Sequence, residues 1–319
     1  MKLIIQIPCY NEEHSLPETL SRLPKEVEGF DKVEWLVIND GSTDNTAEVA
    51  KRYGAHHIVN FARNRGLASA FMAGINAALD LGADVIINTD ADNQYNADDI
   101  PALTRPILEG RADIVIGARP IEKIKHFSPI KKLLEKFGSL AVRVVSNTSV
   151  QDAPSGFRAF SREAAMRLNV FSKYTYTLET IIQAGEKNLY LVSVPVTVND
   201  DLRKSRLVRN IMDYIKISIL TILRFVVVYN PFKYFMLVGF GLFFVGTVIG
   251  ARYVYFLLLG TPGGHVQSLI LAAILTGIGF QTMMTAFLAD LLAVNRKILE
   301  DVQYKLRKIE TENIKNKTR

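Results

Sequence analysis

Two long apolar stretches near the C-terminus constrain the fold of this chain most. Residues 234–256 and 268–293 are almost free of charge, and each is long enough to cross a bilayer core of roughly 30 Å as a helix. Arg252 and Asp290 lie near the far ends of these stretches, where an ionised group at a membrane interface costs much less than at the bilayer centre. Two buried helices of a soluble core are the alternative, but the length and the near-absence of charge favour two transmembrane helices.

The basic residues predict how these helices are oriented. The link around residues 260–265 carries no Lys or Arg, whereas basic residues are dense before the first stretch and after the second. The positive-inside rule then places both termini in the cytoplasm. The apolar run at the N-terminus is too short for a signal peptide. The single cysteine, Cys9, cannot form an internal disulfide, which fits a reducing compartment.

The net charge of +6 is modest for a chain of 319 residues, and its basic side chains cluster beside the apolar stretches. This arrangement indicates attraction to anionic lipid headgroups rather than to nucleic acid. Residues 121–150 are basic and amphipathic, which fits either a solvated helix face or a segment that touches the bilayer. In residues 208–230, four charged side chains fall on one side of a helix, namely Arg209, Asp213, Lys216 and Arg224. We expect this second segment to be an amphipathic helix in the membrane interface.

The first part of the chain alternates short β-rich runs with helix-like segments. Residues 3–7, 34–38, 85–87 and 114–116 are apolar and rich in Ile and Val, and helical patterns cover residues 67–81 and 98–109. This alternation predicts an α/β domain with a mostly parallel, Rossmann-like sheet covered on both faces. Ligands of such sheets bind beyond the carboxyl ends of the strands.

Four segments therefore organise the chain. We expect a cytoplasmic α/β domain over residues 1–207, the interfacial helix over 208–230, and two transmembrane helices within 231–294. A charged helix or a frayed tail should follow over residues 295–319.

An acidic turn follows the apolar run that ends near residue 87. Asp90 and Asp92 are one residue apart and Gln94 comes next but one, so their oxygens suit a hard cation such as Mg²⁺ or Mn²⁺. Such an ion usually takes its remaining ligands from water and from a substrate's phosphates. A plain surface turn is the alternative, because Asp and Asn favour turns on their own account.

Other polar segments follow the first two strands and open the helix near residue 67. They are residues 8–13, residues 39–44, and the stretch Arg63-Asn-Arg-Gly-Leu67. Backbone N–H groups at a helix start, together with an arginine, suit a diphosphate. The five histidines show no zinc-site spacing, and the sequence contains no Gly-x-x-x-x-Gly-Lys-Ser/Thr loop.

These motifs and their order resemble family 2 glycosyltransferases of the GT-A fold, in the polyprenyl-phosphate branch typified by dolichol-phosphate mannose synthase. The resemblance extends to Gly117-Ala-Arg119, to the segment 152–160, to Glu179 and to Arg203-Lys-Ser-Arg-Leu207. It covers residues 1–207 in detail and the apolar hairpin in general form, where it is similar to bacterial polyisoprenyl-phosphate glucosyltransferases. Asn39 departs from the acid that is more common in the family, and this departure concerns nucleobase selectivity.

The resemblance implies a role for each matching residue. It implies nucleotide-sugar contacts from Pro8, Tyr10, Asn11, Glu12, Asp40, Ser42, Arg63, Asn64, Gly66, Asp90 and Ala91, and metal ligation by Asp90, Asp92 and Gln94. It implies catalytic roles for Asp92, Arg119, Asp152 and Arg158, with Arg158 also holding the lipid phosphate. It implies contacts to the acceptor or its phosphate from Ser155, Glu179, Arg203, Lys204, Ser205 and Arg206. Simpler roles stay open for some: Arg63, Arg119 and Arg158 as salt-bridge partners, Glu179 as a loop buttress, and Glu12 and Glu13 as helix caps.

The implied reaction moves a sugar from a UDP- or GDP-linked donor to dolichyl or undecaprenyl phosphate at the cytoplasmic face of a membrane, with inversion. The acceptor phosphate is already ionised, so a strong general base is not required, and Asp152 is the best candidate for positioning or residual proton handling. A processive polysaccharide synthase is the alternative enzyme, but the Gln-x-x-Arg-Trp motif is missing and Trp35 is the only tryptophan. A non-catalytic lipid–sugar carrier is the third possibility, and spans rich in Gly and Ala would also suit a homo-oligomer.

Overall fold

The computed structural model describes residues 1–120, 138–140, 142–143, 146–170, 176–199, 227, 231–260 and 266–317. Several predicted features lie outside these residues. They are nearly all of the interfacial helix 208–230, most of the basic segment 121–150, and the motif with Arg203, Lys204, Ser205 and Arg206.

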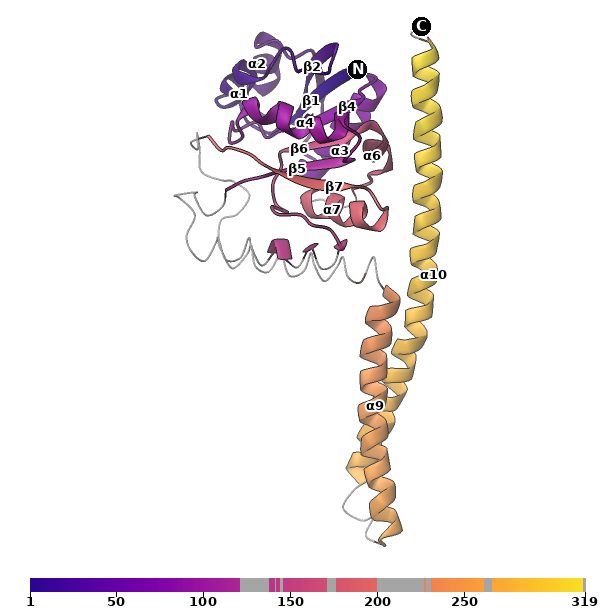
Figure 1. Cartoon of the computed structure of the whole chain (residues 1–319). Coiled ribbons are helices and arrows are strands. Elements are labelled where there is room, and N and C mark those ends of the chain that lie inside the picture. Colours follow the sequence, from indigo (N-terminus) through magenta and orange to yellow (C-terminus); the bar gives the residue numbers. More distant parts are fainter. Residues whose placement is uncertain are drawn as a thin grey trace. The chain divides into compact units, whose positions relative to one another are not determined.

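The described residues of the first domain form a seven-stranded sheet in the order β3-β2-β1-β4-β6-β5-β7 (Figure 1). The strands are β1 (Lys2–Cys9), β2 (Lys32–Asn39), β3 (His57–Asn60), β4 (Val85–Asn88), β5 (Ile114–Ala118), β6 (Arg158–Ser161) and β7 (Leu191–Pro195). All neighbouring pairs are parallel except the two that involve β6, which runs antiparallel to β4 and β5. The predicted mostly parallel sheet is confirmed.

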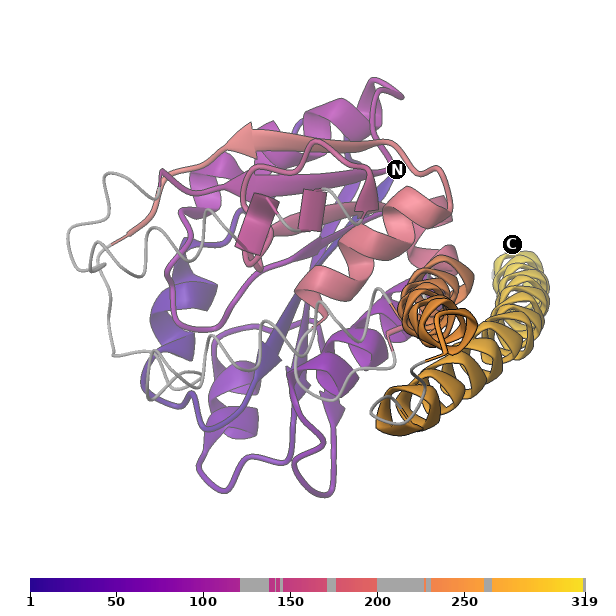
Figure 2. The same cartoon turned by 90° about the horizontal axis from the view of Figure 1, so that it is seen from below.

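Helices cover both faces of this sheet, as the second view also shows (Figure 2). They are α1 (Leu16–Arg22), α2 (Thr46–Arg52), α3 (Leu67–Asp80), α4 (Ile100–Leu108), α6 (Arg162–Arg167) and α7 (Thr177–Glu186), with a short 3-10 turn η1 (Ala97–Asp99). Proline near the first turn suits α1 and α4, because its missing N–H would have no helical partner there.

Alternating side chains of the strands build two cores. Ile4, Ile38 and Ile86 pack with α3, α6 and α7 on one face, whereas Ile5 and Ile87 pack with α1, α2 and α4 on the other. Because the side-chain period of a strand is two residues, an apolar run without alternation is the expected pattern for a strand buried on both faces. The sequence shows this pattern in β1, β2, β4 and β5.

The predicted apolar stretches form two long helices, α9 (Pro231–Leu258) and α10 (Val266–Lys317). Both are long and apolar enough to cross a membrane, with a mean hydropathy of 2.0 for α9 and 1.7 for the span within α10. Glycines let the two helices approach closely: a Cβ on Gly239 would lie 2.8 Å from Met283, and one on Gly246 would lie 2.6 Å from the Thr276 hydroxyl. These small residues serve packing within the hairpin.

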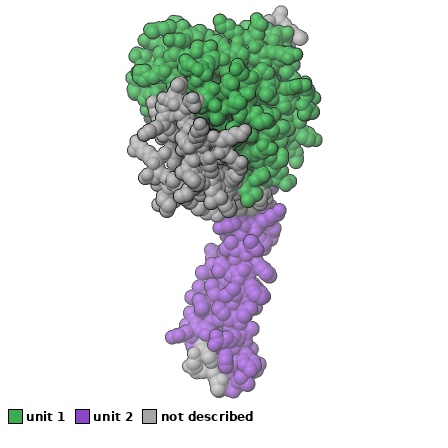
Figure 3. Space-filling view, turned by 60° about the vertical axis from the view of Figure 1, so that its left-hand side comes forward, with its two compact units in different colours: residues 1–218, 302–319 green, residues 219–301 purple. Residues whose placement is uncertain are grey.

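The chain divides into two compact units, coloured separately in Figure 3. One comprises residues 1–218 and 302–319, and the other comprises residues 219–301. The charged C-terminal segment is helical as far as Lys317, and from residue 302 it groups with the first unit. Of the two expectations for this segment, a charged helix or a frayed tail, the structure shows the helix.

An ion-pair cluster around the buried Glu34 joins β1, β2 and β3 and gives a pH-dependent prediction. The Glu34 side chain is 5% exposed, and its carboxylate accepts from Lys2, Lys32 and His57 at 2.7, 2.5 and 2.8 Å. Burial raises the pKa of this carboxyl, but the three hydrogen bonds outweigh burial and lower the pKa to about 2. Because the folded pKa lies below the unfolded one, the stabilisation is complete above the unfolded pKa and is lost as the pH falls from about 4.5 to about 2.

We expect Glu34→Gln to lower the free energy of unfolding by roughly 2 kcal/mol at pH 7, and the difference from wild type to shrink below pH 4.5. Thermal unfolding of the full chain in detergent, monitored by Trp35 fluorescence, measures this difference in stability. Glu26→Gln is the matched control, because Glu26 is exposed and its replacement should change nothing. A Glu34→Gln deficit that stays constant down to pH 3 would contradict the prediction.

Candidate active site

The strand directions bring five polar segments to one edge of the sheet. Strands β1, β2, β4 and β5 run parallel to one another, so the loops after Cys9, Asn39, Asn88 and Ala118 leave from the same edge. Strand β6 runs the opposite way, so the segment that precedes it, residues 152–157, reaches this edge too. Most of the predicted site residues lie on these segments, and the fold therefore gathers them.

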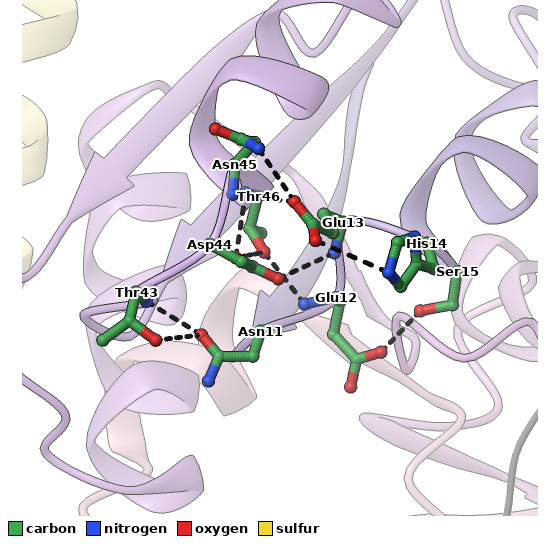
Figure 4. Close-up of polar contacts among 9 residues, drawn as sticks. All are labelled: Asn11, Glu12, Glu13, His14, Ser15, Thr43, Asp44, Asn45 and Thr46. Atoms are coloured by element: carbon green, nitrogen blue, oxygen red, sulfur yellow. Dashed lines mark hydrogen bonds and ion pairs between the residues drawn. The ribbon is translucent and has the colours of Figure 1, made fainter.

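The loops after β1 and β2 are tied together by side chains, as Figure 4 shows. The Asn11 side-chain oxygen accepts from the Thr43 backbone N–H at 2.8 Å, and the Glu12 backbone N–H donates to the Thr46 hydroxyl at 2.9 Å. Glu13 Oε2 accepts from the backbone and the side chain of Asn45, each at 3.0 Å. These contacts fix the two predicted nucleotide loops as one surface.

Glu12 is nearly buried and acts at the start of α1. Its backbone oxygen accepts from the N–H groups of Ser15 and Leu16, and its carboxylate accepts from the Ser15 hydroxyl at 2.5 Å. Both contacts fit the capping role that the sequence left open. Pro8 is buried at the end of β1, whereas Tyr10 is 42% exposed beside the loop.

Asp40 organises the third predicted nucleotide segment. It is 3% exposed, and its two oxygens accept from the backbone N–H groups of Arg65 and Gly66 at 2.7 and 2.9 Å. Gly66 has a φ of 91° and precedes the first turn of α3, a conformation that glycine adopts without strain. Asp40 thus shapes the helix start, and Arg63 and Asn64 lie exposed on the same loop.

Asn39 is held within the fold. Its side-chain N–H donates to the Asn60 side-chain oxygen at 3.0 Å, and its own oxygen accepts from the Ser42 backbone at 3.1 Å. The residue that departs from the family pattern therefore supports the loop that carries Ser42.

The acidic turn is anchored from two sides. The Thr19 hydroxyl of α1 donates to the Ala91 backbone oxygen at 2.9 Å. On the other side the Asn199 side chain donates to the backbone oxygen of Asn93 at 2.9 Å. The Asn199 backbone N–H donates to the backbone oxygen of Gln94 at 2.8 Å. Asn93 itself has a φ of 56°. Asp90, Asp92 and Gln94 are half-buried on this fixed turn.

Gly156 lies directly against the Asp90 carboxylate. A Cβ at Gly156 would be 2.8 and 2.9 Å from the two Asp90 oxygens and 3.0 Å from the Tyr176 hydroxyl. The Gly156 backbone is held in place, because its N–H donates to the Tyr95 hydroxyl and its oxygen accepts from the Asn88 side chain, both at 2.9 Å. Only glycine fits this close approach of the 152–157 segment to the acidic turn.

Arg119 and Asp152 form a buried ion pair. Arg119 donates through Nε and Nη2 to the two Asp152 oxygens at 2.7 and 3.0 Å, and through its backbone N–H at 3.1 Å. The side chains are 7% and 1% exposed. Burial raises the pKa of the Tyr95 hydroxyl, and the charges of Arg119, Asp90 and Asp152 also act on it. The predicted catalytic residues Arg119 and Asp152 and the predicted metal ligand Asp90 thus lie close enough to Tyr95 for their charges to act on its hydroxyl.

Arg158 differs from expectation. Its side chain is fully buried, and its guanidinium donates to the backbone oxygens of Ser155, Ala153 and Thr177 at 2.7, 2.7 and 2.8 Å, and to the Thr180 hydroxyl at 2.6 Å. Burial lowers the pKa of this group to about 10, so it stays charged at neutral pH. The geometry makes Arg158 a brace for the 152–157 segment and not a direct ligand of a lipid phosphate.

Ser155 and Glu179, two predicted acceptor residues, are also interior. Ser155 is 0% exposed, and Glu179 in the first turn of α7 is 4% exposed. Because the Ser155 side chain is buried, it cannot contact an acceptor in this structure, and the predicted contact is wrong. For Glu179, burial fits the buttressing role that the sequence left open.

The residues of the turn fit a hard divalent cation that shares its ligands with a substrate. Among the described residues, no cluster of three or more His, Cys, Asp or Glu could hold a metal ion alone. Two carboxylates and an amide oxygen would fill only part of the six positions that Mg²⁺ demands. A nucleoside diphosphate and water would have to supply the rest, which is the usual arrangement for this ion.

Sequence reasoning missed several residues of this site. Asn88, Tyr95, Gly156, Tyr176 and Asn199 all hold the acidic turn or the segment beside it. Of these residues, only Asn88 could have been identified from the local sequence, because it is a polar residue at the end of an otherwise apolar strand. The others act through contacts between residues far apart in the chain.

The family model named Glycosyl transferase family 2 matches residues 4–168, and the chain belongs to this family. The predicted family is confirmed, and with it the enzyme class. The matched range contains the nucleotide loops, the acidic turn, Arg119 and Arg158.

Similar proteins include enzymes of polyprenyl-phosphate glycosylation. The chain is 30% identical over 218 residues to an undecaprenyl-phosphate mannosyltransferase of Micrococcus luteus, covering 65% of this chain and 88% of the relative. It is 28% identical to a UDP-N-acetylglucosamine–dolichyl-phosphate N-acetylglucosaminyltransferase of Methanococcus voltae, covering 60% and 82%. Relatives from the branch that the sequence resembles thus differ in sugar and in lipid.

A solved structure shares the fold. Glucosyl-3-phosphoglycerate synthase of Mycobacterium tuberculosis, in complex with Mn²⁺, UDP-glucose and phosphoglyceric acid, superposes with a TM-score of 0.55 at 19% identity. The match covers 71% of this chain and 78% of that one. It confirms the GT-A-like architecture.

The buried Arg119–Asp152 pair gives a prediction about stability. Replacing one partner leaves the other charge buried and uncompensated, so Asp152→Asn and Arg119→Met should each lower the free energy of unfolding by about 3 kcal/mol. The double variant should lose far less than the sum, because no unpaired charge remains. Thermal and denaturant unfolding of the full chain test this, and additive losses would show that the pair is not coupled.

Proposed function

We propose that this enzyme transfers one sugar from a nucleotide diphosphate donor to the phosphate of a membrane polyprenol. The observation that carries the proposal is the meeting of the acidic turn, the paired Arg119 and the two nucleotide loops at one edge of the sheet. The named relatives support a polyprenyl phosphate as the acceptor, and the two apolar helices support a membrane location.

The donor would bind across the loops after β1, β2 and β4. Asn11, Glu12, Asp40 and Ser42 belong to the loops that would receive the nucleoside, with Pro8, Tyr10 and Ala91 alongside. Arg63, Asn64 and Gly66 would face the diphosphate, because backbone N–H groups at the start of α3 favour an anion. The donor would be a UDP- or GDP-linked sugar.

Asp90, Asp92 and Gln94 would hold Mg²⁺ or Mn²⁺ together with diphosphate oxygens. When bound, the ion would offset the negative charge that develops on the leaving nucleoside diphosphate. Asp152 would hold Arg119 as a second positive charge at that position through the bidentate pair. Half-buried carboxylates on a braced turn lose little freedom when they bind.

A lipid phosphate oxygen would attack the anomeric carbon as the bond from that carbon to the diphosphate oxygen breaks. The bonding electrons would leave with the nucleoside diphosphate, and attack from the opposite side inverts the configuration. The attacking phosphate is already ionised, so no strong base is needed, and we assign Asp152 to positioning. Arg158, Ser155 and Glu179 would shape the acceptor side from within, and Arg203, Lys204, Ser205 and Arg206 would supply charge to the lipid phosphate.

The membrane parts would hold this edge at the depth of the lipid headgroup. Residues 1–207 would form the cytoplasmic catalytic domain, 208–230 the interfacial helix, and α9 with the first part of α10 the hairpin. Both termini would be cytoplasmic, by the distribution of basic residues. Confining the catalytic domain to the surface raises its encounter rate with a lipid that cannot leave the bilayer.

Donor transfer is the direct test. Purified full-length protein in nanodiscs receives undecaprenyl or dolichyl phosphate, Mn²⁺, and labelled UDP- and GDP-sugars one at a time. We expect label to enter the organic phase with one donor, one sugar per lipid. Nucleotide binding without transfer from any donor would contradict the proposal, and long polymers would favour a processive synthase.

In the same assay Asp92→Asn should lower the transfer rate by about 100-fold or more, because it removes a negative ligand oxygen from the turn. Asp98→Asn is the matched control, since Asp98 is exposed only six residues further on and should keep the wild-type rate. Wild-type turnover by Asp92→Asn would refute the metal assignment.

Gly156→Ala should weaken Mn²⁺ binding in the presence of the nucleotide by roughly tenfold, because the new methyl group would displace the Asp90 carboxylate. Titration followed by electron paramagnetic resonance measures the affinity. Gly138→Ala serves as the control, because a Cβ there meets no described atom within 4 Å. Unchanged Mn²⁺ affinity in a folded Gly156→Ala protein would contradict the role of this close approach.

A further inference from the structure

The C-terminal part of α10 has two distinct faces. One face packs on the catalytic domain: the Tyr304 hydroxyl donates to Glu163 Oε1 at 2.8 Å, and Arg307 Nη1 donates to the backbone oxygens of Met166 and Leu168 at 3.1 and 2.8 Å. Thr311, one turn further along, is 4% exposed. This face therefore has its partner within the same chain.

The other face carries an exposed apolar seam, made of Leu299, Val302, Leu306 and Ile309. These side chains are 69%, 48%, 55% and 54% exposed, although each would gain free energy from burial. Their spacing of three, four and three residues is the a/d pattern of a heptad repeat. In this repeat Leu299 and Leu306 occupy the a positions, and Val302 and Ile309 occupy the d positions. The residues that contact the catalytic domain then fall on the opposite side of the helix, with Tyr304 and Thr311 at f and Arg307 at b.

We propose that this seam packs against the same seam of other copies of the chain, as a parallel coiled coil. Leu at a with Val and Ile at d favours more than two strands. Copies of a chain that spans the membrane share one orientation in it, so equivalent helices emerge in parallel and in register. The proposal rests on α10 crossing the bilayer, and it is independent of the transfer reaction.

Charge and register favour a second copy over an unrelated partner. Lys305 occupies position g and Glu310 position e of the next heptad, and these positions meet with opposite charge between neighbouring helices of a parallel coiled coil. The seam continues to Asn313 at the following a position, and a single Asn at a favours a defined register. A membrane anchor adds a high effective concentration, which a seam this short needs.

Disulfide trapping tests the pairing. Val302→Cys replaces a seam residue at d by one of similar size, and Lys308→Cys places a thiol at the exposed c position of the next heptad. The full chain in phosphatidylcholine vesicles is oxidised with copper phenanthroline and run on a non-reducing gel. We expect about fivefold or more disulfide-linked dimer for Val302→Cys than for Lys308→Cys, because only d thiols would come within bonding distance. The wild type, whose Cys9 is buried, should give no dimer.

Charge reversal tests the register. Lys305→Glu added to Val302→Cys should lower the dimer yield, since it sets like charges across the seam, and adding Glu310→Lys should restore the yield. Equal trapping of the Val302→Cys and Lys308→Cys proteins would overturn the proposal and leave lipid or another protein as the cover of the seam. Failure of Glu310→Lys to rescue would overturn the parallel register.

Discussion

The direction of strand β6 is the constraint on which the site depends. Because β6 runs antiparallel between β4 and β5, the segment 152–157 reaches the edge where the parallel strands end. There the Gly156 backbone lies against the Asp90 carboxylate, at a distance that no side chain permits. Donor and acceptor halves of the proposed site are thus joined by a backbone contact, and the residues around it serve to keep that contact in place.

Buried polar groups hold this contact together. The Asn88 side chain accepts from Gln6 and donates to Gly156 and Tyr176, Tyr95 accepts from Gly156, and Arg158 braces the carbonyl groups of the same segment. A buried polar group is costly unless it is paired, so each of these residues depends on the others. Such a network favours one arrangement of the acidic turn before any ligand binds, which is how binding groups are preorganised.

The sequence predicted what depends on local pattern. The apolar Ile- and Val-rich runs identified β1, β2, β4 and β5, and the motif order identified the family. Strand β6 was missed because Arg-Ala-Phe-Ser begins with a charged residue and has no apolar run. The role of Arg158 at a phosphate was also predicted from the local sequence alone. Only the tertiary structure shows that its guanidinium donates mainly to backbone carbonyl oxygens. The apolar seam of α10 was missed because the charged residues around it led us to interpret the segment only as a charged helix or tail.

The central claim is that the acidic turn, Arg119 and the loops of β1 and β2 form one donor site. A crystal or cryo-EM structure of the full chain with Mn²⁺ and a bound nucleoside diphosphate tests it most directly. We expect the ion in contact with a carboxylate oxygen of Asp90 or Asp92 at about 2.1 Å, with the diphosphate between the ion and the start of α3. A nucleotide bound away from this edge, or an ion that touches neither carboxylate, would contradict it.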